Sequence, residues 1–398
     1  MVPIRRTGLI SATALAALCV TLAPAATAAS SAKDGLYGDK DPTHDGVWRT
    51  SIAMLAQQRD GYVPAGTATR WLRAQQCDNG AYMSYRADTA KACDPKKLDT
   101  NATAAAVQAL AATGSNTDGS TVEKAVAWLK TSQNKDGGWP FYAGAPSDAN
   151  STAVVIGALT ATGARPASVV KGGKSPYDAL AALRLPCDAK PAEKGAYTFQ
   201  PDKNNKLYAN DYATAAAALA GFGSGLSVNA PDADKPVKAP ECATKETPAV
   251  AAEGAAAYLD KKLAKTGHLI SAMDGKSPDH NATTVAVLAL AAGGHTEAAK
   301  KPYAWLEKNS AAWSKTTPAA LGMLVLAAQA TGETPPAKTV KALNASGPAP
   351  VKRATGSETK EEDSDDGVNT TVIAVIAVGL VAGIGGGLLV SLRRKRQS

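Results

Sequence analysis

Carboxylate and amide side chains recur along the chain in a spacing that could serve acid–base chemistry or ligand binding. The pattern Asp-x-Asn-(Ala/Ser)-Thr occupies residues 99–103, 148–152 and 279–283, and a variant, Asn-Asp-Tyr, occupies 210–212. Paired carboxylates can act as general acid and base, for example on a glycosidic bond. Asp and Asn are also the preferred N-caps of α-helices. The pattern therefore predicts helix starts first and a polar ligand site second.

Each copy of the pattern precedes a run of Ala, Val and Leu that ends at a glycine. Apolar residues recur in these runs at helical spacing, as at Val107, Leu110 and Ala111. Because the runs carry almost no charge, we expect helices that are buried on all sides. Amphipathic segments alternate with them and should lie outside. The alternation predicts six inner/outer helix hairpins, at 44–76, 100–132, 149–185, 209–262, 280–309 and 316–344.

The polar residues of the pattern should gather on one face of the fold, because all of them precede inner helices. The loops at 77–99, 137–148 and 186–208 open on the same face and carry aromatic residues. Aromatic and polar groups at a concave end suit a bulky amphipathic ligand. The predicted ligand-binding residues are Asp99, Asn101, Phe141, Tyr142, Asp148, Asn150, Tyr208, Asn210, Asp211, Asp279 and Asn281.

A second motif alternates with the first. It is strongest at 128–139, where Trp-Leu is followed by Gln-x-x-Asp-Gly-Gly-Trp, and a weaker copy lies at 71–82. Its glycines permit the positive φ of a tight turn, its glutamines can bind loose backbone groups, and its aromatic rings cover the junction. The motif predicts a structural role for Gln76, Gly80, Tyr82, Gln133, Gly137 and Trp139.

The segment at 133–139 resembles the repeat of the squalene cyclase and protein prenyltransferase β-subunit families. The Asp-x-Asn-Ala-Thr helix starts are similar to the inner-helix starts of that superfamily, which also includes cobalamin carriers of the transcobalamin type. The resemblance covers roughly residues 44–344. The count of six inner and six outer helices suggests a closed α/α toroid rather than an open solenoid. The resemblance implies the same all-α fold, an α/α toroid of six helical hairpins with twelve helices. Such a toroid would close, so that residues near 50 and near 325 are neighbours.

No complete catalytic set and no metal site is predicted. The string at 363–366 matches the Asp-x-Asp-Asp proton donor of hopene cyclases, but it lies in a charged segment near the C-terminus rather than in a cavity. The zinc site of protein prenyltransferases needs Asp, Cys and His together. His280 is near Asp279, but no cysteine occupies a matching inner-helix position.

The two ends of the chain are predicted to be targeting and anchoring segments. Residues 1–28 combine two arginines, an apolar run and a small-residue cleavage site, as secretory signals do. The toroid domain would occupy 29–344, and a disordered Pro-rich and acidic stalk 345–369. An uncharged transmembrane helix at 370–392 and a basic cytoplasmic tail at 393–398 complete the chain. These segments predict a single-pass membrane protein with an extracellular ectodomain.

The charge balance argues against a nucleic-acid partner. Six of the 43 basic residues, and none of the 35 acidic ones, lie in the signal and the tail, so the rest of the chain carries about +2. Four cysteines remain after the signal, which favours two disulfides in an exported protein. Cys77 and Cys93 share one loop. We predict that they pair, and that the connection 223–247 wraps around the outside and brings Cys242 to Cys187.

Two functions follow from these observations. The first is a membrane-anchored binding module that captures a small-molecule or lipid ligand at the cell surface, with cobalamin as a candidate and an uptake transporter as a further partner. Its support is the lack of a complete catalytic set, the predicted anchor and the resemblance to cobalamin carriers. The alternative is an enzyme that acts on a polysaccharide or an isoprenoid lipid through carboxylates at the inner-helix N-termini.

Overall fold

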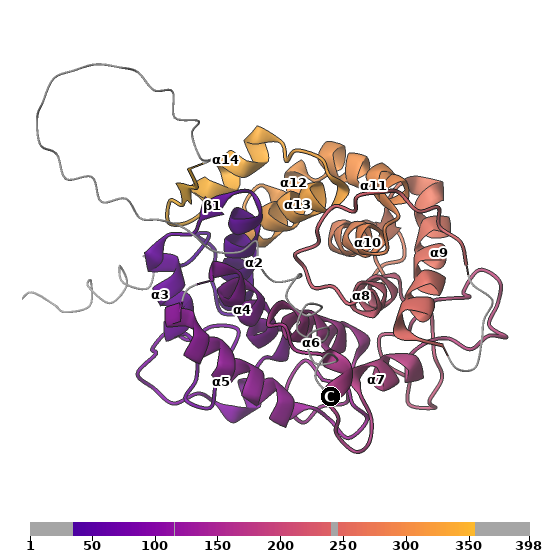
Figure 1. The fold of residues 1–398 in the computed structure, drawn as a ribbon, viewed down its shortest axis with the longest axis horizontal. Helices are drawn as coiled ribbons and strands as arrows, with labels where there is room; N and C mark the ends of the chain where they lie inside the picture. Colours follow the sequence, from indigo (N-terminus) through magenta and orange to yellow (C-terminus); the bar gives the residue numbers. More distant parts are fainter. Residues whose placement is uncertain (1–34, 115, 240–245, 355–398) are drawn as a thin grey trace, which may run out of the picture. The chain divides into compact units, whose positions relative to one another are not determined.

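The Ala-, Val- and Leu-rich runs form a closed ring of inner helices. The computed structural model describes residues 35–114, 116–239 and 246–354, and those up to Arg353 belong to one unit. Each inner helix contacts the next one along the chain, and the last contacts the first (Figure 1). The inner helices are α2 (Gly46–Arg59), α4 (Thr100–Thr113), α6 (Ala149–Ala161), α8 (Asp211–Gly221), α10 (His280–Ala292) and α13 (Pro318–Thr331).

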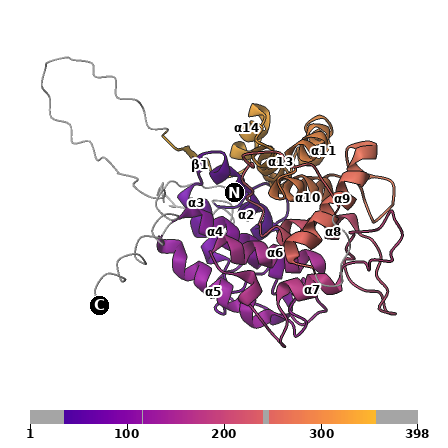
Figure 2. The same cartoon turned by 45° about the vertical axis from the view of Figure 1, so that its right-hand side comes forward.

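Six outer helices surround the ring, each in contact with the inner helix that precedes it (Figures 1 and 2). The described residues therefore form the six predicted hairpins, and one short helix, α12 (Ala311–Ser314), adds to the twelve expected helices. Two 3₁₀ turns lie at Pro95–Lys97 and Pro166–Ser168. The outer helices are α3 (Gly66–Ala74), α5 (Asn116–Ser132), α7 (Pro176–Ala182), α9 (Pro248–Thr266), α11 (Thr296–Asn309) and α14 (Ala337–Ala345).

Side-chain size and charge explain which helices lie inside. In α4 every residue from Ala102 to Leu110 is buried, and none of them is charged. The outer helix α3 is amphipathic and buries Ala68, Trp71 and Leu72 against the ring. Full burial of a leucine side chain such as Leu72 stabilises the fold by about 1.5–3 kcal/mol. The difference in patterning thus assigns each helix to its layer.

The ring closes where α13 meets α2. Gly322 lies against Ile52, and a Cβ added to this glycine would meet the Ile52 carbonyl oxygen at 3.0 Å. The missing side chain therefore lets the two helix backbones approach closely. The predicted contact between residues near 50 and near 325 is confirmed.

Two short sheets accompany the helices in the described part of the chain. β2 (Leu269–Ile270) pairs antiparallel with β3 (Pro278–Asp279), and Leu269 lies opposite Asp279. β1 (Tyr62–Val63) pairs antiparallel with β4 (Val351–Lys352), and Tyr62 lies opposite Lys352. β4 corrects one predicted boundary, because 346–353 were expected to begin the stalk. Backbone pairing with β1 holds them to the toroid instead.

The remaining end segments lie outside the described residues. These are the predicted signal at 1–28, most of the predicted stalk, the predicted span at 370–392 and the tail at 393–398. Within the described ranges, no helix is long and apolar enough to cross a membrane.

The second sequence motif joins neighbouring hairpins. Gln133 donates from Nε2 to the carbonyl oxygens of Gly137 and Val169, at 2.8 and 3.1 Å. Gly137 has a φ of +88°, and a Cβ there would meet the Ser175 carbonyl oxygen at 2.3 Å. Trp139 is fully buried. The weaker copy behaves alike: Gln76 donates to the carbonyl oxygens of Gly80 and Thr121 at 3.1 and 2.8 Å, and Tyr82 is fully buried.

The connection from α8 to α9 crosses the ring, so the prediction that it wraps around the outside is wrong for its described part. Gly225 packs against Gly157 of α6, where a Cβ on Gly225 would meet the Gly157 Cα at 3.1 Å. The Leu226 N–H donates to Gln108 of α4 at 2.9 Å, and Leu226 and Val228 are buried. We call residues 224–239 the strap. Its small and apolar first residues suit the ring interior, although its later residues suggested a solvated loop.

The strap then follows the C-terminal ends of other inner helices. Arg59 of α2 donates to the Val228 carbonyl oxygen at 3.2 Å. The Lys235 N–H donates to the Gly294 carbonyl oxygen at 2.8 Å, and His295 Nδ1 lies 2.8 Å from the Lys235 carbonyl oxygen. The strap therefore contacts α2, α4 and α6 and the α10–α11 turn.

One of the two predicted disulfides is present as expected. Cys77 and Cys93 are bonded, with their Cα atoms 5.9 Å apart. Cys187 is also in a disulfide. Its expected partner, Cys242, lies outside the described residues, so this second pairing stays a prediction.

Candidate functional site

Four residues of the Asp/Asn pattern are N-caps of inner helices. The side chains of Asp99, Asp148, Asn210 and Asp279 each accept a hydrogen bond from the backbone N–H three residues later, at 2.9, 2.7, 2.8 and 2.8 Å. Each cap thereby satisfies an amide that a helix start leaves without a partner.

The threonine four residues after each cap ties the helix to the loop before it. The hydroxyl oxygens of Thr103, Thr152, Thr214 and Thr283 accept from the backbone N–H groups of Tyr82, Trp139, Tyr197 and Leu269, at 2.9, 3.0, 2.9 and 3.0 Å. The first and last positions of the pattern thus have structural roles.

The residue two positions after each cap lines the centre of the ring. Asn101, Asn150, Tyr212 and Asn281 hold this position, and all four line one cavity of about 390 Å³ at the N-terminal ends of the inner helices. This volume lies in the range of small-molecule sites. We call it the mouth cavity. Its other lining residues are His44, Asp45, Trp48, Asp99, Ala102, Phe141, Asp148, Ser151, Val154 and Phe199.

Six of the predicted ligand-binding residues line the mouth cavity, and five do not. The six are Asp99, Asn101, Phe141, Asp148, Asn150 and Asn281. Asn210 and Asp279 cap their helices outside its lining. Asp211 faces outer helix α9, where it accepts a hydrogen bond from the Tyr258 hydroxyl and lies 3.4 Å from Lys262 Nζ.

The other two are exposed on loops. Tyr142 is 43% exposed and packs edge-on against Phe141, with ring centroids 4.5 Å apart. Tyr208 is 52% exposed, and its hydroxyl donates to Asp202 at 3.3 Å. Both rings contact neighbours in their own loops rather than lining the cavity.

Several lining residues were missed as ligand-binding residues. Tyr212 could have been found by aligning 210–212 with the Asp-x-Asn copies, since it occupies the asparagine position. Phe199 had only the general signal of an aromatic loop residue. His44, Asp45 and Trp48 gave none, because the first repeat lacks the pattern. The start of the first inner helix and the two residues before it thus supply the largest unpredicted part of the site.

Two buried carboxyl groups border the mouth cavity. Burial raises the pKa of Asp99, and the hydrogen bonds from the Ala102 N–H and the Ser84 hydroxyl oppose this. Burial likewise raises the pKa of Asp148 against its hydrogen bonds from Ser151. A carboxyl group with a raised pKa holds its proton closer to neutral pH, which suits a general acid or base.

A third carboxyl group differs from these two. Burial also raises the pKa of Asp45, opposed by Arg49, whose Nη1 lies 2.9 Å from the carboxylate. Arg49 is itself buried and donates to the backbone carbonyl oxygen of Lys40 at 2.7 Å. Asp45 is thus held by an ion pair, whereas Asp99 and Asp148 are held by hydrogen bonds from uncharged groups.

Amide groups complete the polar lining. The Oδ1 atoms of Asn101 and Asn150 are buried and have no hydrogen-bond partner within the described part of the chain. Burial raises the pKa of Tyr212, and a hydrogen bond from Asn281 opposes this. Unpartnered amide oxygens next to a cavity suit a ligand with hydrogen-bond donors.

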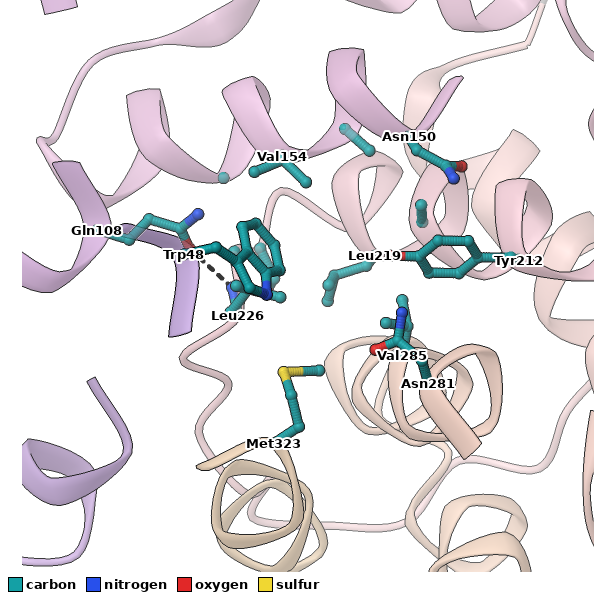
Figure 3. Close-up of a pocket in the computed structure, with 15 residues that line it drawn as sticks. Trp48, Gln108, Asn150, Val154, Tyr212, Leu219, Leu226, Asn281, Val285 and Met323 are labelled. Carbon is teal, nitrogen blue, oxygen red and sulfur yellow. Dashed lines mark hydrogen bonds between the residues drawn. The ribbon is translucent and has the colours of Figure 1, made fainter. Parts of the chain in front are cut away.

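A second, smaller cavity lies deeper in the ring. This deep pocket measures about 30 Å³ and shares Trp48, Asn150, Val154, Tyr212 and Asn281 with the mouth cavity. Figure 3 shows Trp48 and Tyr212 on facing sides of it. Its other lining residues are Gln108, Ala153, Gly157, Ala216, Leu219, Ser224, Gly225, Leu226, Val285 and Met323.

Metal chemistry has no obvious site in the part of the chain that the structure describes. There, no three His, Cys, Asp or Glu side chains gather closely enough to hold a metal ion. His295 contacts Glu253 at 2.9 Å, but its other ring nitrogen lies against a backbone carbonyl oxygen.

Residues 100–174 match the family of the squalene-hopene cyclase C-terminal domain. The matched segment holds the strong copy of the Gln-x-x-Asp-Gly-Gly-Trp motif and two inner helices that border the mouth cavity. The comparison with curated proteins finds no match.

Several solved structures have a similar fold. A protein from Actinoplanes is 14% identical, with 77% of this chain and 99% of that chain covered and a TM-score of 0.46. The type II terpene cyclase MstE from Scytonema is 14% identical, with 71% and 77% covered and a TM-score of 0.43. The ent-copalyl diphosphate synthase from Streptomyces platensis is 15% identical, with 72% of this chain and 50% of that chain covered and a TM-score of 0.45. The matched segment and its motif identify residues 100–174 as repeats of the squalene cyclase superfamily.

Proposed function

We propose that this protein is an enzyme that acts on an isoprenoid or a similarly bulky amphipathic substrate in the mouth cavity. One observation carries the proposal: Asp99 and Asp148 border the same cavity of about 390 Å³, and burial raises the pKa of both. The match of 100–174 to a cyclase domain family favours an isoprenoid over a polysaccharide.

In this proposal a protonated Asp148 or Asp99 donates its proton to the substrate, and the ionised form can take one back. The aromatic side chains of Trp48, Tyr212 and Phe199 border the same space, and aromatic rings can stabilise positive charge that develops on a hydrocarbon. The amide oxygens of Asn101 and Asn150 would orient polar groups of the substrate.

Turnover by the full-length protein tests this proposal. We would incubate it with squalene and with polyprenyl alcohols and diphosphates of increasing length, and identify products by mass spectrometry. Asp148→Asn and Asp99→Asn should each lower turnover at least tenfold while the fold persists, because asparagine caps helices as well as aspartate. Asn210 already does so in this chain, accepting from Ala213 at 2.8 Å.

Asp279→Asn is the matched control, because Asp279 is a cap of the same type that does not line the mouth cavity. It should keep full activity. If no substrate is converted, or if the double variant at positions 99 and 148 is as active as the wild type, the enzymatic proposal fails.

One observation favours a second candidate, a binding module without catalysis. Both carboxylates are occupied as caps, while the unpartnered groups are amides. We propose as this candidate a surface protein, exported and anchored at 370–392, that passes its ligand to an uptake transporter. Cobalamin would have to lie across the rim, against Phe141 and Phe199. Retention of cobalamin or polyprenyl lipids without conversion would favour this candidate.

A further inference from the structure

Gln108 places an unpaired hydrogen-bond donor at the floor of the ring. Its side chain is 2% exposed, and its Oε1 accepts from the Leu226 N–H at 2.9 Å. Because the Leu226 N–H needs an acceptor, the Gln108 side-chain amide must turn its oxygen toward Leu226. Its amino group, Nε2, therefore points away from this hydrogen bond. This Nε2 is buried and has no partner within the described residues. Buried donors are nearly always paired, so this one calls for an explanation.

The deep pocket has room for a small partner at this donor. Gln108 lines it together with apolar residues such as Leu219, Val285 and Met323, and its volume is about 30 Å³. That is space for one or two water-sized groups. Figure 3 shows Gln108 at one side of the pocket and its hydrogen bond to Leu226. A single donor in apolar surroundings suits one oxygen atom at the end of a hydrocarbon chain.

The mouth cavity and the deep pocket adjoin each other along α6, because they share five lining residues. Asn150 borders both cavities, and Gly157, which packs beside Gln108, lines the deeper one. These two residues are seven positions apart on one helix, which corresponds to a depth of about 10 Å. A slender chain that enters between Trp48 and Tyr212 would therefore reach Gln108 within the length of a medium alkyl chain.

We infer that Gln108 Nε2 binds a hydroxyl or carbonyl oxygen at the inner end of the ligand. The ligand class is then an amphipathic molecule with a polar head in the mouth cavity and a slender apolar body that ends in an oxygen. This inference rests on the proposed function only in taking the mouth cavity as the binding site. It adds a specificity group that recognises the far end of the molecule.

Two probes of equal size test the inference on the full-length protein. Decanol and nonanediol both carry a hydroxyl group at one end of a chain of the same length. The other end is a methyl group in decanol and a second hydroxyl group in nonanediol. Calorimetry gives the ratio of their Kd values, decanol over nonanediol. Gln108→Met removes the donor, and the ratio should fall about fivefold, the effect of one hydrogen bond. Asp279→Asn, outside both cavities, should leave the ratio unchanged.

The ratio is informative even if Gln108→Met loosens the strap, because both probes are measured on the same protein. A second readout needs no variant: in wild-type protein labelled with nitrogen-15, nonanediol should shift the Gln108 side-chain amide signal and decanol should not. An equal ratio in both proteins, or an amide signal that does not move, overturns the inference, as would a site filled by water alone or failure of both probes to bind. Neither probe can react, so absence of turnover would count only against the enzyme proposal.

Discussion

Replacing Asp148 separates its two roles, helix cap and titratable group. Asp148→Ala removes both, whereas Asp148→Asn keeps a side-chain oxygen for the Ser151 N–H and removes the charge. In the wild type that hydrogen bond measures 2.7 Å, and both residues are about 1% exposed. The pair of variants therefore isolates the cost of burying the carboxylate.

The magnitudes follow from burial. Loss of an N-cap costs about 0.5–2 kcal/mol, and we expect the upper end, about 2 kcal/mol, for Asp148→Ala because water cannot replace the lost acceptor of the buried Ser151 amide. Burial raises the pKa of Asp148 above its ordinary value of 3.8. The folded state thus keeps the proton to higher pH than the unfolded state, and ionisation destabilises the fold as pH rises through this window.

Asp148→Asn should therefore equal or exceed the wild type in stability at neutral pH. The stability advantage of Asp148→Asn over the wild type should disappear below the ordinary pKa of an aspartate, where Asp148 is neutral in both the folded and the unfolded wild type. Urea unfolding followed by circular dichroism at a series of pH values from about 3 to about 8 measures this difference in stability directly. Asp279→Asn serves as a control cap that does not line the mouth cavity.

One result would refute this reasoning. If Asp148→Asn is as unstable at neutral pH as Asp148→Ala, the ionised carboxylate itself stabilises α6. The positive end of the helix dipole and the backbone N–H groups would then outweigh burial, and Asp148 could not serve as a proton donor near neutral pH.

Three further predictions concern the scaffold. Gly137→Ala should lower the free energy of unfolding by about 2–4 kcal/mol, because the φ of Gly137 is +88° and the new Cβ would meet the Ser175 carbonyl oxygen at 2.3 Å. The urea midpoint of unfolding should fall accordingly, and an unchanged midpoint would contradict the close approach. Gln133→Met should cost about 1–3 kcal/mol, because two buried carbonyl oxygens lose their donor, and thermal unfolding checks this. Cys77→Ser with Cys93→Ser should cost about 3 kcal/mol for this loop length, and peptide mapping without reductant should show the bridge only in the wild type.

The fold could be predicted from the sequence because its determinants are local and repeated. Helical spacing, uncharged inner runs and a cap before each run lie within short windows, so each hairpin is specified independently of the others. Asp99, Asp148 and Asp279 cap their helices as the pattern predicts. Closure of the ring followed from the count of hairpins. The pairing of β4 with β1 could not be foreseen, because it joins two segments that are distant in sequence.

The candidate site was predicted less completely, and the reason is geometric. The five positions of the Asp-x-Asn-(Ala/Ser)-Thr pattern are neighbours in sequence. Only the third position, two residues after the cap, lines the mouth cavity in all four copies. A helix turns by about 100° per residue, so one step along the chain separates Asp211, which faces α9, from Tyr212, which lines both cavities. Trp48 belongs to the first repeat, which lacks the pattern. Its position in the site became clear only from the structure of the closed ring.

The strap explains why the ring is a pocket rather than a pore. A toroid of small-residue helices leaves an open centre, and its floor must come from elsewhere in the chain. Gly225 and Gly157 allow the strap backbone to contact α6, Leu226 fills the gap, and Gln108 binds the strap amide. None of these residues belongs to a repeated motif. The same contacts leave Gln108 Nε2 without a partner beside the deep pocket, so the structural need for a floor also creates the donor that we assign to ligand recognition.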